Sequence, residues 1–133
     1  KPPEIEQNRI YISRQKATSR RVLNETLLEP LLNEYGFQVL ICEQLSLAEQ
    51  IRLFSNTEAI VGPHGAGLAN IMYPQHKISI GEICCPPTVP CYLVIARQLG
   101  HSFSRLQADP VGDNKIGDMS LTSEKLKSWL KTL

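Results

Sequence analysis

Short apolar runs alternate with helix-like segments along this chain, and this alternation constrains the fold more than any other feature. Runs rich in β-branched and apolar side chains predict strands over residues 9–13, 38–42, 58–62, 77–84 and 102–106. Apolar side chains at helical spacing predict helices over 24–36, 46–54, 67–73 and 92–99, with a last helix after residue 122. Continuous apolar strands separated by helices indicate a doubly wound α/β domain, in which both faces of a mostly parallel sheet are covered.

Two segments complicate this pattern. Pro30 lies inside the first predicted helix, so we expect either a kink there or a helix that starts later than the apolar spacing suggests. The stretch 109–118 is rich in Gly and Asp and predicts a polar loop.

The size and charge of the chain limit the classes of function that it can have. Its 133 residues, 42% apolar and 20% charged, predict one globular domain over 9–133, preceded by a linker over 1–8. The linker-like opening suggests that the chain is part of a longer protein. A net charge of +1 argues against a broad basic surface for nucleic acid. No apolar run approaches the roughly 20 residues that span a bilayer, so we expect no transmembrane segment.

The cysteines give no indication of a metal site. Cys42, Cys84, Cys85 and Cys91 do not form two C-x-x-C pairs, so we expect buried or partly buried thiols rather than zinc ligands. The sequence also lacks an Asp-x-Asp pair of the kind that holds a divalent cation beside a phosphate. We therefore expect no metal and no cofactor.

Polar residues follow several predicted strands at the point where each strand ends. Arg14 and the Arg20–Arg21 pair come after the first strand, His64 comes after the third, and Glu82 lies near the end of the fourth. Ligands of doubly wound sheets bind beyond the carboxyl ends of the strands, so these groups should meet at one edge of the sheet.

The segment 61–70, VGPHGAGLAN, carries the strongest local signal. Its glycines let the backbone come close to a ligand, and the amides of Gly65, Ala66, Gly67 and Leu68 should open a helix without intrahelical partners. Free amides at a helix start favour an anion such as a diphosphate, and the adjacent His64 can donate to the same group. Asn70, one turn further on, could reach a neighbouring loop or a ligand hydroxyl. The alternative is a tight strand-to-helix turn with a structural histidine.

The basic residues strengthen the prediction of an anion site. A phosphate held between the first and third loops would gain charge-assisted bonds from both sides. Arg14 is the preferred candidate because it follows the strand directly, whereas Arg20 and Arg21 cannot be distinguished by chemistry; a solvated basic loop is the alternative.

Two acidic or amide-bearing positions could complete this site. Glu82 could accept hydrogen bonds from a ribose diol, or it could be a surface glutamate paired with a lysine. Asn24, next to Glu25, could cap the first helix or orient an arginine.

The combination of an upstream R…NE element with HGAGL-x-N resembles glycosyltransferase family 61. The resemblance covers about residues 9–100, and its matching positions are Arg14, Arg20, Asn24, Glu25, Gly36, Gln50, Gly62, His64, Gly65, Gly67, Leu68, Asn70 and Glu82.

This resemblance implies the C-terminal half of a GT-B enzyme, a protein of two Rossmann-like halves in which this half holds a nucleotide sugar, usually a UDP-sugar. It implies inverting, metal-independent transfer to a glycan acceptor, as in capsular polysaccharide synthesis. Arg14 and His64 would then offset charge on the leaving diphosphate, with His64 as an alternative base. The other donor contacts would come from Arg20, Arg21, Asn24, Gly65, Ala66, Gly67, Leu68, Asn70 and Glu82.

Part of such an enzyme would lie outside this chain. The acceptor-binding N-terminal half would be a separate partner, so the chain alone should bind the donor but turn over little. The alternatives are a non-catalytic nucleotide-binding or interaction module and a phosphosugar enzyme that uses His64 as acid or base. We expect a cytoplasmic protein, at the inner face of the membrane if it makes polysaccharide.

Overall fold

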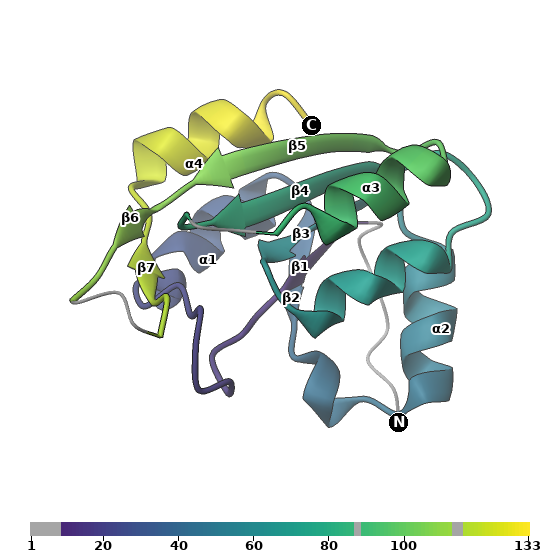
Figure 1. Ribbon diagram of the computed structural model, residues 1–133, viewed down its shortest axis with the longest axis horizontal. Helices are drawn as coiled ribbons and strands as arrows, with labels where there is room; N and C mark the ends of the chain where they lie inside the picture. Colours follow the sequence, from purple (N-terminus) through teal and green to yellow (C-terminus); the bar gives the residue numbers. More distant parts are fainter. Residues whose placement is uncertain (1–8, 87–88, 113–115) are drawn as a thin grey trace.

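The computed structural model describes residues 9–86, 89–112 and 116–133, and the predicted linker over 1–8 lies outside the described residues. It confirms an α/β domain built on a five-stranded parallel sheet (Figure 1). The strands of this sheet are β1 (Arg9–Ile12), β2 (Phe37–Leu40), β3 (Ala59–Pro63), β4 (Ser79–Cys84) and β5 (Ser102–Gln107). The α-helices are α1 (Glu25–Glu34), α2 (Leu47–Ser55), α3 (Cys91–Gln98) and α4 (Ser123–Leu130). Two 3₁₀ helices, η1 (Cys42–Gln44) and η2 (Ala66–Met72), and two short strands, β6 (Asp109–Pro110) and β7 (Met119–Ser120), complete the fold.

The order of strands in the sheet is β2-β1-β3-β4-β5. The chain moves outward from β1 to β2 and then returns to the other side of β1 to form β3. The loops that follow β1 and β3 therefore leave the sheet in opposite directions. In a doubly wound sheet of this order, the ligand crevice opens at the carboxyl ends of these two strands.

Each face of the sheet packs against its own helices. The side chain of Tyr11 belongs to a core cluster that includes Leu28 of α1 and Trp129 of α4. The flanking Ile10 and Ile12 belong to a second cluster with α2, η2 and α3 (Figure 1). This alternation follows from the period of two in a strand, and it explains why the strands are apolar on both faces.

Some element boundaries differ from those predicted. Helix α1 begins at Glu25 and includes Pro30, so the prediction of a later start is wrong. Pro30 removes only the bond that its own N–H would have made, because the rest of the helix is held by packing against the sheet. The segment predicted as a helix over 67–73 is a 3₁₀ helix, which suits a short element that Pro74 follows closely.

The predicted polar loop over 109–118 is in part a β-hairpin, in which β6 pairs with β7. β7 also meets the loop after β1: Val22 bridges to Met119, and the Met119 N–H donates to the Arg21 carbonyl at 2.9 Å. The C-terminal segment therefore fixes the path of the loop that carries the predicted arginines.

Gly81, in the middle of β4, lies under the indole of Trp129. A Cβ at this glycine would lie 2.5 Å from Cη2 and 2.7 Å from Cζ2 of the ring. The indole Nε1 donates to Ser104 Oγ at 2.7 Å. Only a glycine leaves room for this ring, so Gly81 sets how closely α4 approaches the sheet. In the described part of the chain, no helix is long and apolar enough to cross a bilayer.

Candidate functional site

The candidate site lies at the switch point of the sheet, where the segments that follow β1 and β3 meet. Arg14 comes two residues after the end of β1, and His64 and Gly65 follow β3 directly. The His64 N–H donates to the Ile83 carbonyl of β4 at 3.0 Å, which extends the β3–β4 pairing to the start of the turn. The backbone pairing of the sheet therefore sets the position of this histidine.

Arg14 crosses from the first loop to the third. Its Nε and Nη2 donate to the Ser19 carbonyl at 3.2 and 3.1 Å, which holds the guanidinium on its own loop. Its other terminal nitrogen lies against Gly65, where a Cβ would lie 2.9 Å from the guanidinium carbon. The two loops thus meet through a side chain and a bare backbone, and a larger residue at position 65 would displace the arginine.

A second cation lies near Arg14. Burial lowers the pKa of Arg14, and the neighbouring charge of Arg20 lowers it further. Within the described residues, neither guanidinium has a carboxylate at ion-pair distance, in contrast to Arg9, Arg21 and Arg105. Two adjacent cations that have no carboxylate partner among the described residues favour binding of an anionic ligand.

Arg20 and Arg21, which sequence alone cannot distinguish, have different surroundings. The guanidinium of Arg21 forms an ion pair with Asp118 at 2.7 Å, and the hydrogen bond from Arg21 lowers the pKa of this aspartate. Arg20 has a φ of 53°, a left-handed conformation that is uncommon for a residue with a side chain. Its N–H donates to the Ile116 carbonyl at 2.9 Å. The structure therefore favours Arg20 over Arg21 as the second anion-binding arginine.

His64 is held by a buried carboxylate. Its Nδ1 lies 2.9 Å from Glu82 Oε2, and the Glu82 side chain is fully buried. The other oxygen, Oε1, accepts bonds from Nε and Nη2 of Arg105 at 2.8 and 2.7 Å. The result is a chain of three side chains from β3 through β4 to β5, which orients the imidazole and leaves Nε2 as its second polar atom.

The alternative of a surface glutamate paired with a lysine is wrong for Glu82. The carboxylate is not at the surface, and its partners are Arg105 and His64 rather than a lysine. The predicted ribose contact stays a prediction, but both carboxylate oxygens already accept hydrogen bonds within the protein.

Sequence reasoning missed Tyr92, at the start of α3. Its ring meets the His64 imidazole edge-on, with centroids 5.1 Å apart and planes at 61°. Burial, and after it the neighbouring Cys91 and Glu82, raise the pKa of Tyr92, and the nearby charges of Arg20 and Arg14 partly oppose this rise. Its position in the first turn of the helix after β4 was the available signal, because that helix also starts at the carboxyl edge of the sheet.

The glycine-rich turn offers fewer free amides than predicted. The Leu68 N–H donates to the Gly65 carbonyl at 3.0 Å, because a 3₁₀ helix pairs residues three apart. The expectation that four successive amides are unpaired is therefore wrong for Leu68. Gly62 and Gly67 allow close packing against Ile12: a Cβ at either would lie 2.8 Å from an Ile12 atom. Ala66 begins η2 and is exposed.

Two predicted amide side chains are engaged elsewhere. The Asn70 Nδ2 donates to the Gly67 carbonyl at 2.8 Å and to Gln50 Oε1 at 3.2 Å, so it connects η2 to α2. Asn24 makes no side-chain cap on α1, so that alternative is wrong. Its amide instead pairs with the Leu121 backbone, donating to the carbonyl at 2.7 Å and accepting from the N–H at 3.1 Å. Asn70 therefore ties η2 to α2, and Asn24 ties the start of α1 to the segment after β7.

Glu25 anchors the base of the Arg14 loop. Its carboxylate accepts bonds from the Ser13 hydroxyl and, at 3.0 Å, from the Tyr11 hydroxyl. Burial raises the pKa of Glu25, and these two hydrogen bonds oppose the rise. Because Ser13 directly precedes Arg14, this buried cluster helps to fix where the arginine leaves the sheet.

Three of the four cysteines are buried or partly buried, as predicted. The exception is Cys91, which is exposed. Burial raises the pKa of Cys42 to about 12. Within the described residues, no three metal-ligating side chains gather at one place.

A doubly wound domain with two arginines and a glycine-rich turn at its switch point has the features of a domain that binds a phosphate-bearing ligand. Comparison with known families places the chain more narrowly. The chain belongs to the glycosyltransferase 61 family, whose model matches residues 1–88. This range contains every site residue predicted from the sequence, and Tyr92 and Arg105 lie beyond it.

Curated relatives agree with this assignment. The chain is 34% identical over 103 residues to the EGF domain-specific O-linked N-acetylglucosamine transferase of Drosophila melanogaster, covering 75% of this chain and 20% of that protein. It is 29% identical over 97 residues to the proteins of the same name from Pan troglodytes and Bos taurus, covering 69% of this chain and 18% of each relative. The chain thus spans about a fifth of the length of these relatives.

Proposed function

We propose that this chain forms the donor-binding part of a glycosyltransferase that moves a sugar from a nucleotide sugar to an acceptor hydroxyl. One observation carries this proposal: Arg14 reaches from the loop after β1 to the backbone of Gly65 after β3. The two loops therefore meet at the switch point, which is where a doubly wound sheet binds a nucleotide.

Arg14 and Arg20 would hold the diphosphate of the donor. Guanidinium groups bind phosphate oxygens through paired N–H donors, and two of them match the charge of a diphosphate. We propose a UDP-linked sugar as the donor, in line with the family resemblance. Gly65 leaves room for the guanidinium of Arg14, and the rings of His64 and Tyr92 meet each other at the same edge of the sheet.

The reaction would proceed by direct displacement with inversion. The acceptor oxygen forms a bond to the anomeric carbon, the bond from that carbon to the diphosphate breaks, and a base takes the hydroxyl proton. Negative charge then grows on the leaving diphosphate, where Arg14 and Arg20 can stabilise it without a metal ion. The proposed role of Glu82 and Arg105 is to position the imidazole of His64.

His64 has two possible tasks in this scheme. With a proton on Nδ1 directed to Glu82, the neutral ring presents Nε2 as an acceptor, as a base requires. The doubly protonated ring would instead donate from Nε2 to the leaving diphosphate. A pH profile of the rate separates these tasks. A base must be deprotonated to act, so the rate would fall at low pH, whereas an acid must be protonated to act, so the rate would fall at high pH.

The names of the relatives indicate which sugar and which acceptor to propose. Their names describe O-linked transfer of N-acetylglucosamine to EGF domains. This favours N-acetylglucosamine as the transferred sugar and a protein hydroxyl as the acceptor, over the glycan acceptor expected for capsular polysaccharide. The alternative proposal is a nucleotide-binding module that carries out no chemistry itself, since the chain spans only about a fifth of these proteins.

Thermal stabilisation by a panel of ligands tests the proposed function. UDP, GDP, NAD and glucose 1-phosphate are compared at equal concentration, and UDP should raise the unfolding temperature most. At a hundred times its dissociation constant, a ligand adds about 2.7 kcal/mol to the free energy of unfolding. A preference for NAD would contradict the assignment, and no response to any ligand would show that this chain has no donor site of its own.

A further inference from the structure

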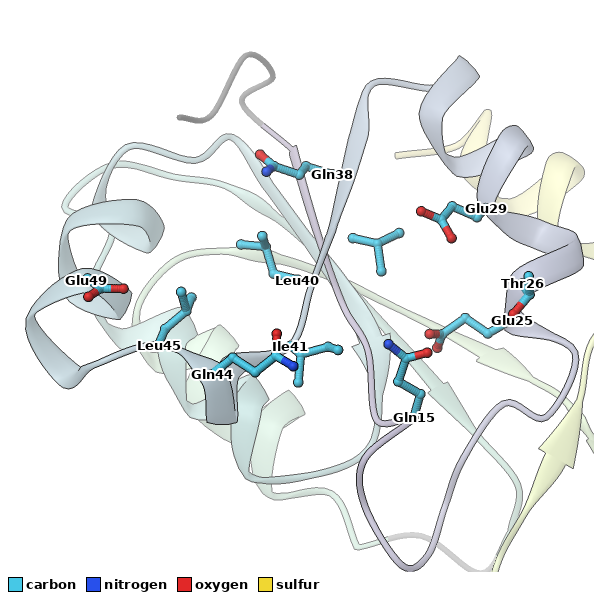
Figure 2. Close-up of a pocket in the computed structure, with 11 residues that line it drawn as sticks. Gln15, Glu25, Thr26, Glu29, Gln38, Leu40, Ile41, Gln44, Leu45 and Glu49 are labelled. Atoms are coloured by element: carbon cyan, nitrogen blue, oxygen red, sulfur yellow. The ribbon is translucent and has the colours of Figure 1, made fainter. Parts of the chain in front are cut away.

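A groove runs along the outer edge of β2, on the side of β1 opposite to β3, and Gln15 and Glu25 line the end of it that is nearest to the Arg14 loop. It has a volume of about 480 Å³ and lies between α1 on one side and η1 with α2 on the other (Figure 2). Val39, Leu40 and Ile41 form its floor, and glutamates stand on both sides of it. The groove lies within the residues that the family model matches, but the proposed transfer reaction assigns no role to Glu29, Val39 or Glu49.

The floor of the groove is an open strand edge. Within the described residues, β2 pairs with β1 alone. The Ser13 N–H donates to the Leu40 carbonyl at 2.8 Å, so Leu40 directs its backbone groups toward β1. Because neighbouring residues of a strand face alternate sides, the N–H and C=O of Val39 point away from β1 into the groove. These are the groups that another extended chain would pair with.

The charges around the edge are of one sign. Among the described residues that line the groove are Glu25, Glu29 and Glu49, and none of these described residues is a lysine or an arginine. Glu25 is buried and already accepts bonds from Ser13 and Tyr11, so Glu29 and Glu49 provide the available negative charge. Figure 2 shows these two residues on opposite sides of β2, one on α1 and the other on α2.

This arrangement distinguishes between possible occupants. A second copy of the chain would bring the same glutamates to the edge, and like charges would oppose the pairing. A basic strand would gain from both carboxylates. Successive side chains of a strand point to opposite faces, so two consecutive basic residues would direct one side chain to Glu29 and the other to Glu49.

We propose that the outer edge of β2 is a docking site for an extended segment of another polypeptide with two consecutive basic residues. The segment adds a strand beside Val39, and its basic side chains flank the sheet. The proposed contact uses Glu29, Val39 and Glu49, none of which is assigned to the nucleotide site, so it can be tested separately from the proposed function.

The test uses the peptide acetyl-Thr-Val-Lys-Arg-Val-Thr-amide. The control peptide, acetyl-Thr-Lys-Val-Arg-Val-Thr-amide, has the same composition but places both basic side chains on one face. The ¹⁵N-labelled chain is titrated with each peptide and followed by NMR. We expect the amide signals of Val39 and Ile41 to move, with tighter binding of the first peptide.

Three variants locate the contact. Glu29→Gln and Glu49→Gln should each weaken binding roughly two- to fivefold, as exposed ion pairs do. Val39→Pro removes only an outward N–H, which an edge strand tolerates, and should weaken binding about threefold to tenfold. Circular dichroism verifies that each variant is folded, and none should change UDP binding.

Several results would overturn the proposal: equal binding of the two peptides, signals that move elsewhere than β2, or unchanged affinity in both glutamate variants. Dimerisation of the free chain through β2, detected by sedimentation and lost in Val39→Pro, would also overturn it in favour of self-association.

Discussion

The guanidinium of Arg14 lies against the backbone of Gly65, and this contact joins the loops that follow β1 and β3. Ser19 holds the same guanidinium from the other side through its carbonyl. The missing side chain of Gly65 therefore matters to the site as well as the charge of Arg14, because it leaves room for the guanidinium.

Replacing Gly65 with alanine tests this contact. The glycine has an extended backbone, with φ 167° and ψ 171°, so the substitution adds only a Cβ that collides with Arg14. We expect Gly65→Ala to displace the guanidinium and weaken UDP binding by about tenfold, the value of one charge-assisted hydrogen bond. The control is the same substitution in an Arg14→Ala background, where calorimetry should show no further loss. Additive losses would contradict the contact.

Packing of α4 on the sheet predicts a second effect of a glycine. Gly81→Ala would place a Cβ against the Trp129 ring, so we expect a loss of about 1–3 kcal/mol in the free energy of unfolding. Urea denaturation measures this loss. In a Trp129→Leu background the ring is gone, and Gly81→Ala should cost much less. An equal cost in both backgrounds would show that the ring is not the cause.

Arg105 neutralises a carboxylate that water does not reach. Arg105→Ala would leave the buried Glu82 without its guanidinium partner, and we expect the free energy of unfolding to fall by about 1–3 kcal/mol. Removing the charge as well, in Glu82→Gln with Arg105→Ala, should restore part of the loss. If the double variant is less stable than Arg105→Ala alone, the charge of Glu82 is not the cause of the lower stability of Arg105→Ala.

Asp118 gives a prediction for pH dependence. The hydrogen bond from Arg21 lowers the pKa of Asp118 in the folded state, so folding favours the ionised form. This stabilisation is present above the unfolded pKa of about 3.9 and is lost as the pH falls through the folded pKa. Asp118→Asn should therefore lower the free energy of unfolding at pH 7 and match the parent chain at the acid end of the profile. Asp109→Asn serves as the control, because the exposed Asp109 lies 3.9 Å from Lys125 in a weak pair; a similar profile would contradict a special role for Asp118.

The sheet could be predicted from the sequence because each of its strands is marked by residues that are neighbours along the chain. Each strand is a continuous apolar run, and the helix between two strands requires a parallel crossover. Arg14 and His64 could be placed for the same reason, since each directly follows a strand and all parallel strands end at one edge.

The parts that sequence missed depend on contacts between distant segments. Arg105 meets Glu82 because β5 aligns these two residues, and no local pattern gives that register. Asn24 pairs with Leu121, 97 positions away, although its local context suggested a helix cap. The N–H of Leu68 donates to the Gly65 carbonyl because η2 is a 3₁₀ helix. The apolar spacing before Pro74 predicts a helix but does not distinguish a 3₁₀ helix from an α-helix.

The central claim is that Arg14 and Arg20 bind the diphosphate of a nucleotide sugar, and calorimetric titration with UDP tests it most directly. The chain is titrated in EDTA with UDP and with uridine, together with the variants Arg14→Gln, Arg20→Gln and Lys16→Gln, the last an exposed cation on the same loop. We predict binding of UDP but not uridine, a loss of about tenfold or more in each arginine variant, and little change in Lys16→Gln. Equal affinity for UDP in Arg14→Gln and the parent chain would contradict the account.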